Sequence, residues 1–415
     1  MSATTDPCCG NQPSMLSVDQ AIEQLLAQAA AVTESEQVGL AAAAGRVLAL
    51  DLASPIDVPG FDNSAMDGYA LHSRDIEAAR GTGLPVTQRI TAGSVGERLQ
   101  PGCAARIFTG APLPEGADTV VMQELCRVAG DRVLLEAAVS AGLNIRPRGN
   151  DIAAGSIVLE RGTLLEAAHL GLAASVGIAT VEVSRRLRVA VFSTGDELVE
   201  PGKPLAPGQI YNSNRYQLNA LLAAQGCEVI DLGSIADDFS TTRETLLQAA
   251  AQADLVMTTG GVSVGEEDHV KAALEAVGAL HLWRIRMKPG KPLAFGRIDD
   301  IPFIGLPGNP VSVFVTFLLF ARPYLRAMQG RTDAGPHCYP VRAGFDYRAK
   351  QRREYVRVRL HADHDGMPVA ETFPRQGSDV LSSVAWADGL AEISEDSTVQ
   401  AGEIVSFMPF TEWAR

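Results

Sequence analysis

The stretch Leu255-Val-Met-Thr-Thr-Gly-Gly-Val-Ser-Val-Gly265 decides the fold of this chain. An apolar strand runs into a glycine-rich turn, and a helical pattern over residues 267–277 follows. Strand, turn and helix in that order form the repeating unit of parallel α/β proteins. Paired glycines let another group approach the backbone, and a helix start offers N–H groups with positive partial charge. The stretch therefore predicts an oxyanion-binding loop, although glycine in such turns can also serve geometry alone.

The same alternation surrounds this stretch on both sides. It predicts a parallel sheet covered by helices. Strands are expected at residues 188–193, 228–232, 255–259, 293–296 and 303–306. Helices are expected at residues 215–225, 241–252, 267–277 and 311–328.

The rest of the chain has a different pattern of apolar, proline and glycine residues, which predicts further domains. Helical patterns cover residues 16–31 and 38–52, and short strands punctuated by proline and glycine follow. A helical stretch at 164–176 then returns, so the β-rich segment is expected to be an insertion. The predicted parts are an N-terminal tail and helix (1–34), a linker domain (35–53 and 156–185), an inserted β-rich domain (54–155), an α/β domain (186–335) and a C-terminal β domain (336–415).

Composition and charge exclude several classes of protein. A formal net charge of −14 argues against nucleic-acid binding, which needs a clustered cationic face. No apolar run reaches the roughly 18–20 residues of a membrane span, and residues 1–14 do not resemble a signal peptide. The six cysteines are scattered, and adjacent Cys8 and Cys9 fit a free tail better than a metal site. We therefore expect a cytoplasmic protein with no membrane and no nucleic-acid partner.

Three strands end in unusual loops that are expected to share one edge of the sheet. These loops are Ser193-Thr-Gly-Asp-Glu-Leu198, Thr258-Thr-Gly-Gly-Val-Ser-Val-Gly265 and Leu306-Pro-Gly-Asn-Pro-Val-Ser312. The third also reads as an ordinary helix start, with Pro310 as the first helical residue. The candidate substrate-binding residues in these loops are Ser193, Thr194, Gly195, Gly260, Gly261, Ser263, Gly265, Pro307, Gly308, Asn309 and Pro310.

Acidic residues follow the same strands. Convergent carboxylates repel one another unless a cation or a proton separates them, and Mg²⁺ is the natural cation for oxygen ligands that face phosphates. Helix-start acids that complement the helix dipole are the alternative, and they account best for Asp238, Glu266 and Glu267. The predicted metal ligands are Asp196, Glu197, Asp237 and Asp268.

A cationic strip, Arg284-Ile-Arg-Met-Lys-Pro-Gly-Lys291, stands out in this acidic chain. Alternation places Arg284, Arg286 and Lys288 on one side of a predicted strand, and the Pro-Gly turn brings Lys291 near them. Cationic side chains also protect exposed strand edges. An oxyanion site beside carboxylates nevertheless needs such a local reversal of charge, so we favour a role in binding.

Six motifs occur in an order that resembles the molybdopterin molybdenumtransferase family, which includes bacterial MoeA and the E domain of gephyrin. The resemblance spans nearly the whole chain. The motifs are Phe61-Asp-Asn-Ser-Ala-Met-Asp-Gly-Tyr69, Phe108-Thr-Gly-Ala-Pro112, Ser193-Thr-Gly-Asp-Glu197, Gly260-Gly-Val-Ser-Val-Gly265, Lys288-Pro-Gly-Lys-Pro292 and Gly305-Leu-Pro-Gly-Asn-Pro310.

The resemblance implies an elongated homodimer of L-shaped, four-domain subunits. Each would contain a three-layer α/β/α molybdopterin-binding domain, a linker domain, an inserted β-rich domain and a small C-terminal barrel-like domain. The cleft would lie between the α/β domain of one subunit and the inserted domain of the other. Across that interface would act Asp67, Thr109, Arg146 and Asp151, while Lys288, Lys291, Arg357 and Ser378 would hold molybdate.

The implied reaction inserts molybdate into adenylylated molybdopterin and releases AMP. Tungstate, a tetrahedral dianion of like charge, is an equal candidate for the metal oxyanion. The implied catalytic residues are Asp67, Thr109, Glu197, Asp237, Asp268, Lys288 and Lys291, with Mg²⁺ as cofactor. Arg284 stands at a position where members of the family often have lysine, so the role of Arg284 stays open.

Two rival functions remain: the upstream molybdopterin adenylyltransferase, whose fold resembles the α/β unit alone, and a gephyrin-like scaffold. Other molybdenum-cofactor enzymes are expected as contacts.

Overall fold

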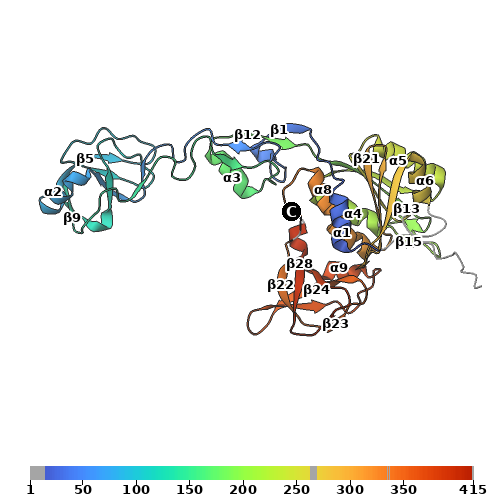
Figure 1. Ribbon diagram of the computed structural model, residues 1–415. Coiled ribbons are helices and arrows are strands. Elements are labelled where there is room, and N and C mark those ends of the chain that lie inside the picture. Colours follow the sequence, from blue (N-terminus) through green and yellow to red (C-terminus); the bar gives the residue numbers. More distant parts are fainter. Residues whose placement is uncertain (1–14, 262–268, 334, 336, 414–415) are drawn as a thin grey trace, which may run out of the picture.

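The computed structural model describes residues 15–261, 269–333, 335 and 337–413. The chain is elongated and bent, as Figure 1 shows. Inserted strands such as β5 (Leu84–Ile90) lie at one end of the long axis, and helix α5 (Phe239–Ala250) lies at the other. The C-terminal strands, including β24 (Arg353–Ala362), branch away from that axis. The L-shaped subunit that the resemblance implies is confirmed.

The α/β unit is built on a six-stranded sheet with a parallel core. Its first four strands run parallel, and the last two, β20 and β18, are antiparallel to their neighbours. The prediction of a parallel sheet was therefore right for the core, but the antiparallel edge strand β18 was not foreseen. In spatial order the strands are β16 (Glu228–Ile235), β13 (Arg188–Thr194), β17 (Leu255–Thr259), β21 (Ile301–Leu306), β20 (Pro292–Ile298) and β18 (Gly278–Arg284).

Helices cover both faces of this sheet, which makes three layers. Val189 and Val191 of β13 pack in the cluster that includes α4 (Ser213–Ala224), while Ala190 and Phe192 pack in the cluster that includes α5. Successive strand side chains point to opposite faces, so one apolar strand serves two cores. Helices α1 (Val18–Leu26) and α7 (Pro310–Thr316) join the first cluster, and α6 (His269–Val277) joins the second.

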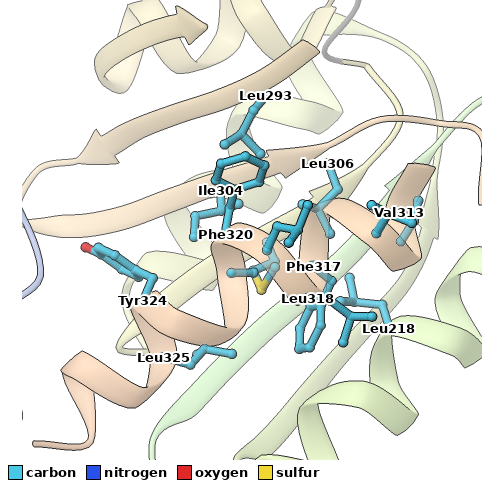
Figure 2. Close-up of a cluster of buried hydrophobic side chains, with 14 of the residues drawn as sticks. Leu218, Leu293, Ile304, Leu306, Val313, Phe317, Leu318, Phe320, Tyr324 and Leu325 are labelled. Carbon is cyan, nitrogen blue, oxygen red and sulfur yellow. The ribbon is translucent and has the colours of Figure 1, made fainter. Parts of the chain in front are cut away.

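The helix Pro310–Met328 forms the centre of the larger core (Figure 2). It contains a π-helical turn at Phe317–Ala321 between α7 and α8 (Arg322–Met328). By length and composition this helix could cross a membrane, but 89% of its most apolar window is buried inside the protein. It is therefore packed as a core helix, with Phe317, Phe320 and Tyr324 among its buried residues.

The linker region is made of two segments that are distant in sequence. Strand β1 (Ser35–Gly39) pairs with β12 (Thr180–Ser184), and β2 (Leu52–Ala53) pairs with β11 (Ile157–Leu159). The helix predicted over residues 38–52 is therefore wrong: only a short 3-10 turn, Leu40–Ala42, occurs there. The second segment contributes α3 (Ala167–Ser175), where a helix was expected.

The inserted segment carries its own six-stranded sheet and its own apolar clusters. Nearby, β3 (Asn63–Ser64) pairs with β10 (Ile145–Arg146), and the short helix α2 (Ile76–Gly81) precedes β5. In spatial order the sheet contains β7 (Thr119–Met122), β4 (Gly68–Leu71), β6 (Ala104–Ile107), β5, β9 (Arg132–Leu135) and β8 (Cys126–Ala129).

The C-terminal segment closes into a five-stranded barrel because β24 pairs with both β25 and β26. The short strand β19 (Met287–Lys288) of the α/β unit adds to β24 in parallel and so joins the two units. Around the barrel run β24, β25 (Pro368–Thr372), β22 (Tyr339–Ala343), β28 (Ile404–Pro409) and β26 (Gly389–Ile393). Smaller elements are α9 (Leu381–Trp386) and the pairs β23 (Tyr347–Arg348) with β27 (Thr398–Val399) and β14 (Leu198–Val199) with β15 (Ile210–Tyr211).

Candidate active-site cleft

A cleft of about 730 Å³ opens where the carboxyl ends of β13, β17 and β21 face the C-terminal barrel. It combines glycine-rich loops, three carboxylates (Glu197, Asp237 and Asp379) and two lysines in one place. Twelve residues that the sequence singled out line it: Thr194, Gly195, Glu197, Asp237, Gly260, Gly261, Lys288, Lys291, Pro307, Gly308, Asn309 and Ser378.

The loops after β13 and β17 meet at the floor of the cleft. Thr194 is 5% exposed, and its hydroxyl has no hydrogen-bond partner among the described residues. A Cβ atom on Gly261 would lie 2.4 Å from Val270 and 2.9 Å from the Thr194 hydroxyl. Glycine is therefore required here by space as well as by its positive φ of 63°. A buried, unpartnered hydroxyl beside this turn is suited to receive a ligand.

Ser193 does not reach the cleft: it is fully buried, and its hydroxyl lies 3.2 Å from that of Thr259. The direct substrate contact predicted for Ser193 is therefore not supported, because it sits one residue inside the strand.

The loop after β21 is held by helix α4. The Asn214 side chain donates to the Gly308 carbonyl at 2.7 Å, and Gln217 donates to the Pro310 carbonyl at 3.0 Å. Pro310 opens α7 and does not line the cleft, as expected for a helix-start proline rather than a ligand contact. The Asn309 side chain makes no capping hydrogen bond, which leaves it available on the cleft wall.

Carboxylates gather at one side of the cleft. Burial, followed by the charges of Asp196, Glu197 and Asp238, raises the pKa of Asp237 above its ordinary value, and nearby His269 opposes this shift. Asp196 accepts a long hydrogen bond of 3.5 Å from the Asp237 backbone N–H. This local excess of negative charge favours a cation or a proton.

Within the described ranges, no group of three or more His, Cys, Asp or Glu side chains is placed to hold a metal ion. Three of the predicted contacts, Ser263, Gly265 and Asp268, lie outside the described residues.

Two lysines, Lys288 and Lys291, also line the cleft. The Lys288 ammonium donates to Glu354 of β24 at 2.8 Å, and the Tyr347 hydroxyl donates to the same carboxylate at 2.6 Å. Glu354 is 6% exposed, so it is a buried anchor for Lys288. Lys291 is exposed, lines the cleft and makes no ion pair with another described residue. Arg284 and Arg286 of the cationic strip do not line it.

Arg357 lies behind the cleft wall instead of on it. Only 1% of it is exposed, and burial lowers the pKa of its guanidinium to about 10. It donates to the Gly377 carbonyl at 3.0 Å and to the Ser383 hydroxyl at 3.1 Å. Arg357 is therefore not among the lining residues, and its side chain supports the loop that carries Ser378, while its predicted molybdate contact stays a prediction.

Sequence reasoning missed several residues of the cleft wall. Ser312, Arg352, Gln376 and Asp379 line it, although none was predicted. Two signals were present: Ser312 belongs to the quoted strand-end loop, and Arg352 belongs to the basic run at residues 348–353. Gln376 and Asp379 flank Ser378, whose carbonyl accepts from the Val311 N–H at 3.1 Å.

The predicted residues of the inserted segment are remote from this cleft within one chain (Figure 1). Asp67 accepts hydrogen bonds of 2.8 Å from both the backbone N–H and the hydroxyl of Thr109. These bonds hold the pKa of Asp67 below its ordinary value. Arg146 and Asp151 also belong to the inserted segment, and none of the four residues lines the cleft of its own chain.

Together these features define a multidomain α/β protein that can hold an anionic ligand at the carboxyl ends of its parallel strands. Matches to known family descriptions agree in chain order. The MoeA N-terminal region (domain I and II) matches residues 16–177, a probable molybdopterin binding domain matches 190–327, and the MoeA C-terminal region (domain IV) matches 324–410.

Whole-length relatives support the same assignment. The chain is 41% identical to the molybdopterin molybdenumtransferase of Haemophilus influenzae, over 95% of this chain and 99% of that protein. It is 38% identical to that of Nostoc sp., over 89% and 93%. A crystal structure of the molybdopterin biosynthesis MoeA protein from Pyrococcus horikoshii, 30% identical, superposes with a TM-score of 0.82 over 95% of this chain and all of that one. The chain belongs to the molybdopterin molybdenumtransferase family, a family of transferases in molybdenum-cofactor biosynthesis.

Proposed function

We propose that this chain inserts molybdate into adenylylated molybdopterin and releases AMP, in the cytoplasm. The observation that carries the proposal is the convergence of strand-end loops, acids and lysines in one cleft. The loop amides and the Thr194 hydroxyl suit the phosphates and the pterin, and Lys288, Lys291 and Ser378 suit a tetrahedral oxyanion. The reactants would meet between the two walls.

The proposed rate enhancement comes from position and charge, not from a protein nucleophile. Glu354 holds Lys288 in place, so its ammonium is fixed before molybdate arrives. Lys291, across the Pro289-Gly290 turn, adds a second cationic side chain to the same wall. Holding the oxyanion against the adenylylated phosphate converts a bimolecular encounter into a positioned one.

Mg²⁺ is the proposed cofactor, and the donor chemistry fits it. Asp196, Glu197, Asp237 and Asp268 would supply carboxylate oxygens, the ligands that Mg²⁺ prefers. Burial raises the pKa of Asp237 first, and the neighbouring charges of Asp196, Glu197 and Asp238 add to the shift, so a bound divalent cation would favour its ionised form. When bound, the ion would neutralise phosphate charge during AMP release.

We further propose that the active unit is a homodimer. Asp67, Thr109, Arg146 and Asp151 cannot reach the cleft of their own chain, so a partner subunit would have to present them. Exposed apolar side chains near Asp67 support a contact surface there: Phe61 is 49% exposed and Met66 is 41% exposed. Contacts with other molybdenum-cofactor enzymes remain part of the proposal.

An AMP-release assay tests the proposed reaction. Adenylylated molybdopterin is incubated with the protein and molybdate, tungstate or neither oxyanion. We expect AMP to appear only when an oxyanion is present, and to be lost in Asp237→Asn and Asp268→Asn proteins that remain folded. AMP release at the same rate with and without an oxyanion would refute the proposal.

The two rivals are tested separately. Incubation with molybdopterin and ATP should give no adenylylated pterin, which an adenylyltransferase would make. A cell that lacks the family enzyme should regain molybdoenzyme activity from the unmodified chain but not from Asp67→Ala. No rescue by the unmodified chain would favour a scaffold, and equal rescue by both chains would argue against the role of Asp67.

A further inference from the structure

One side chain of the inserted segment, that of Arg106 on β6, contacts the chain neighbours of both Asp67 and Thr109. Its Nη1 donates to the carbonyl of Gly68, the residue after Asp67, at 2.9 Å. Its guanidinium lies over the ring of Phe108, the residue before Thr109, at 4.6 Å from the ring centroid. The two segments that are joined by the Asp67–Thr109 hydrogen bonds are therefore both in contact with the same group.

A second hydrogen bond of Arg106 leads to the backbone of Asp67 through Gln123. The Nη2 of Arg106 donates to the side-chain oxygen of Gln123 at 2.6 Å. The Gln123 N–H in turn donates to the Asp67 carbonyl at 3.1 Å. Because Asp67 directly precedes β4, these bonds fix the backbone from which its carboxylate projects.

This set of contacts uses properties that only an arginine side chain combines. The N–H groups of a guanidinium lie in its plane, which leaves its flat face free to pack on aromatic rings. Arg106 donates to two acceptors and also packs on two rings, those of Phe108 and of Tyr69, whose centroid lies 5.1 Å away. Tyr69 is the residue opposite Arg106 in the pairing of β4 with β6. A lysine ammonium or a neutral amide cannot make all of these contacts at once.

We propose that Arg106 is a positioning residue, which holds the Asp67 carboxylate and the Thr109 hydroxyl in the orientation in which they act in the partner's cleft. This inference rests on the proposed function, in which Asp67 and Thr109 serve the cleft of the other subunit. Arg106 acts through these two residues and needs no contact with the substrate. Its charge also adds, after the two hydrogen bonds from Thr109, to the causes that hold the pKa of Asp67 below its ordinary value.

The rate of molybdate-dependent AMP release tests this role. Arg106→Gln should lower the rate on the order of tenfold to a hundredfold, because a displaced reacting group loses proximity. The matched control is Arg127→Gln, which removes an exposed arginine of the same sheet whose ion pair is with Glu136. It should release AMP at the unmodified rate. Equal rates for Arg106→Gln and Arg127→Gln would overturn the positioning role.

Mixed dimers separate positioning from a general loss of folding. Arg106→Gln chains are unfolded and refolded in equal amounts with Lys291→Ala chains, or with Asp67→Ala chains. With Lys291→Ala, each mixed dimer contains one intact cleft, so about a quarter of the unmodified activity should return. A misfolded Arg106→Gln chain could not supply that cleft. With Asp67→Ala, both clefts of each mixed dimer stay defective, so no activity beyond that of the separate proteins should appear.

The Asp67→Ala and Lys291→Ala mixture shows which proposal a negative result concerns. If this mixture regains activity but Arg106→Gln does not complement Lys291→Ala, the positioning role alone is overturned. Recovery from Arg106→Gln mixed with Asp67→Ala would also overturn it, since Arg106 would then act on the lysine side of the cleft. If Asp67→Ala itself fails to complement Lys291→Ala, the shared cleft is refuted and the positioning role is refuted with it.

Discussion

Lys288 illustrates how a single cleft residue depends on a buried neighbour. Its ammonium lies 2.8 Å from Glu354, which also accepts from Tyr347. Glu354 belongs to β24 of the barrel, so the C-terminal segment fixes a side chain of the α/β unit. Glu354 is therefore a positioning residue, and its effect should appear through Lys288.

Glu354→Gln should lower the rate of molybdate-dependent AMP release by on the order of tenfold to a hundredfold, because a misplaced reactant loses proximity. The KM for molybdate should rise as well, since Lys288 is proposed to bind it. Tyr347→Phe, which removes one donor to Glu354, should have a smaller effect. Glu371→Gln, at an exposed position on β25, is the control and should match the unmodified enzyme. Equal kinetics for Glu354→Gln and Glu371→Gln would contradict the positioning role.

Sequence reasoning identified cleft residues well where a loop directly follows a strand. Thr194, Gly260 and Asn309 are examples, because the carboxyl ends of parallel strands share an edge whatever the details of packing. It did not foresee the position of Arg357 behind the wall, which depends on the closure of the barrel. Side-chain direction after a long-range strand pairing cannot be read from spacing alone.

The turn between β19 and β20 is the element that carries both lysines. Gly290 at its centre has a φ of 103°, and a Cβ atom there would lie 2.4 Å from the Thr316 methyl group of the long helix. Gly290→Ala should therefore lower the free energy of unfolding by roughly 1–3 kcal/mol through backbone strain and overpacking. Urea denaturation measures this change.

The matched control for this turn is Gly402→Ala. Gly402 has a similar φ of 98°, but a Cβ atom there meets nothing within 4 Å. It should show the cost of backbone strain alone. If both variants lose the same free energy of unfolding, the close approach of the added Cβ atom to Thr316 does not contribute to the loss.

Element prediction succeeded where pairing is local and failed where it is remote. The strands and helices of the α/β unit follow one another closely, and their apolar patterns show it. Residues 38–52 instead pair with chain more than 100 residues away, and this tertiary pairing overrides their alanine-rich helical pattern. The antiparallel strand β18 is an exception to this rule, because it was missed although it pairs locally with β20 across the Lys-Pro-Gly turn.

At the scale of the whole molecule, a charged joint connects the linker to the α/β unit. Asp254, just before β17, accepts from the Arg185 guanidinium at 2.6 and 2.8 Å and from the Arg188 N–H at 2.8 Å. Burial opposes ionisation of Asp254, but these donors outweigh it and hold its pKa below the ordinary value. Arg185 also pairs with Glu34, at the start of the linker.

Because the pKa of Asp254 is lowered on folding, its stabilisation is present above the unfolded pKa of about 3.8 and is lost as pH falls through the folded value. Asp254→Asn should destabilise the protein by about 3 kcal/mol near neutral pH and by less in acid. Thermal unfolding of both proteins, recorded at intervals of about one pH unit between roughly pH 3 and pH 7, measures this difference. Asp300→Asn, at an exposed ion pair, should change little. A pH-independent loss in Asp254→Asn would contradict the account.

The inserted segment is remote from the cleft of its own chain, so a single chain does not account for the predicted role of its residues in that cleft. Asp67 and Thr109 are joined by two hydrogen bonds. They belong to the inserted segment, which Figure 1 shows apart from the α/β unit that carries Lys291. Spacing along the sequence gives no information on such distances, since the insertion is carried outward by the linker. The proposed dimer places the two ends together, and this is the central claim of the account.

Mixing two inactive variants tests that claim most directly. Asp67→Ala and Lys291→Ala chains are each assayed for molybdate-dependent AMP release, then unfolded together, refolded in equal amounts and assayed again. If each cleft takes Lys291 from one subunit and Asp67 from the other, half of the random dimers are mixed and each contains one intact cleft. The mixture should then recover about a quarter of the unmodified activity. No recovery, with mixed dimers shown to form, would mean that the cleft is not shared between subunits.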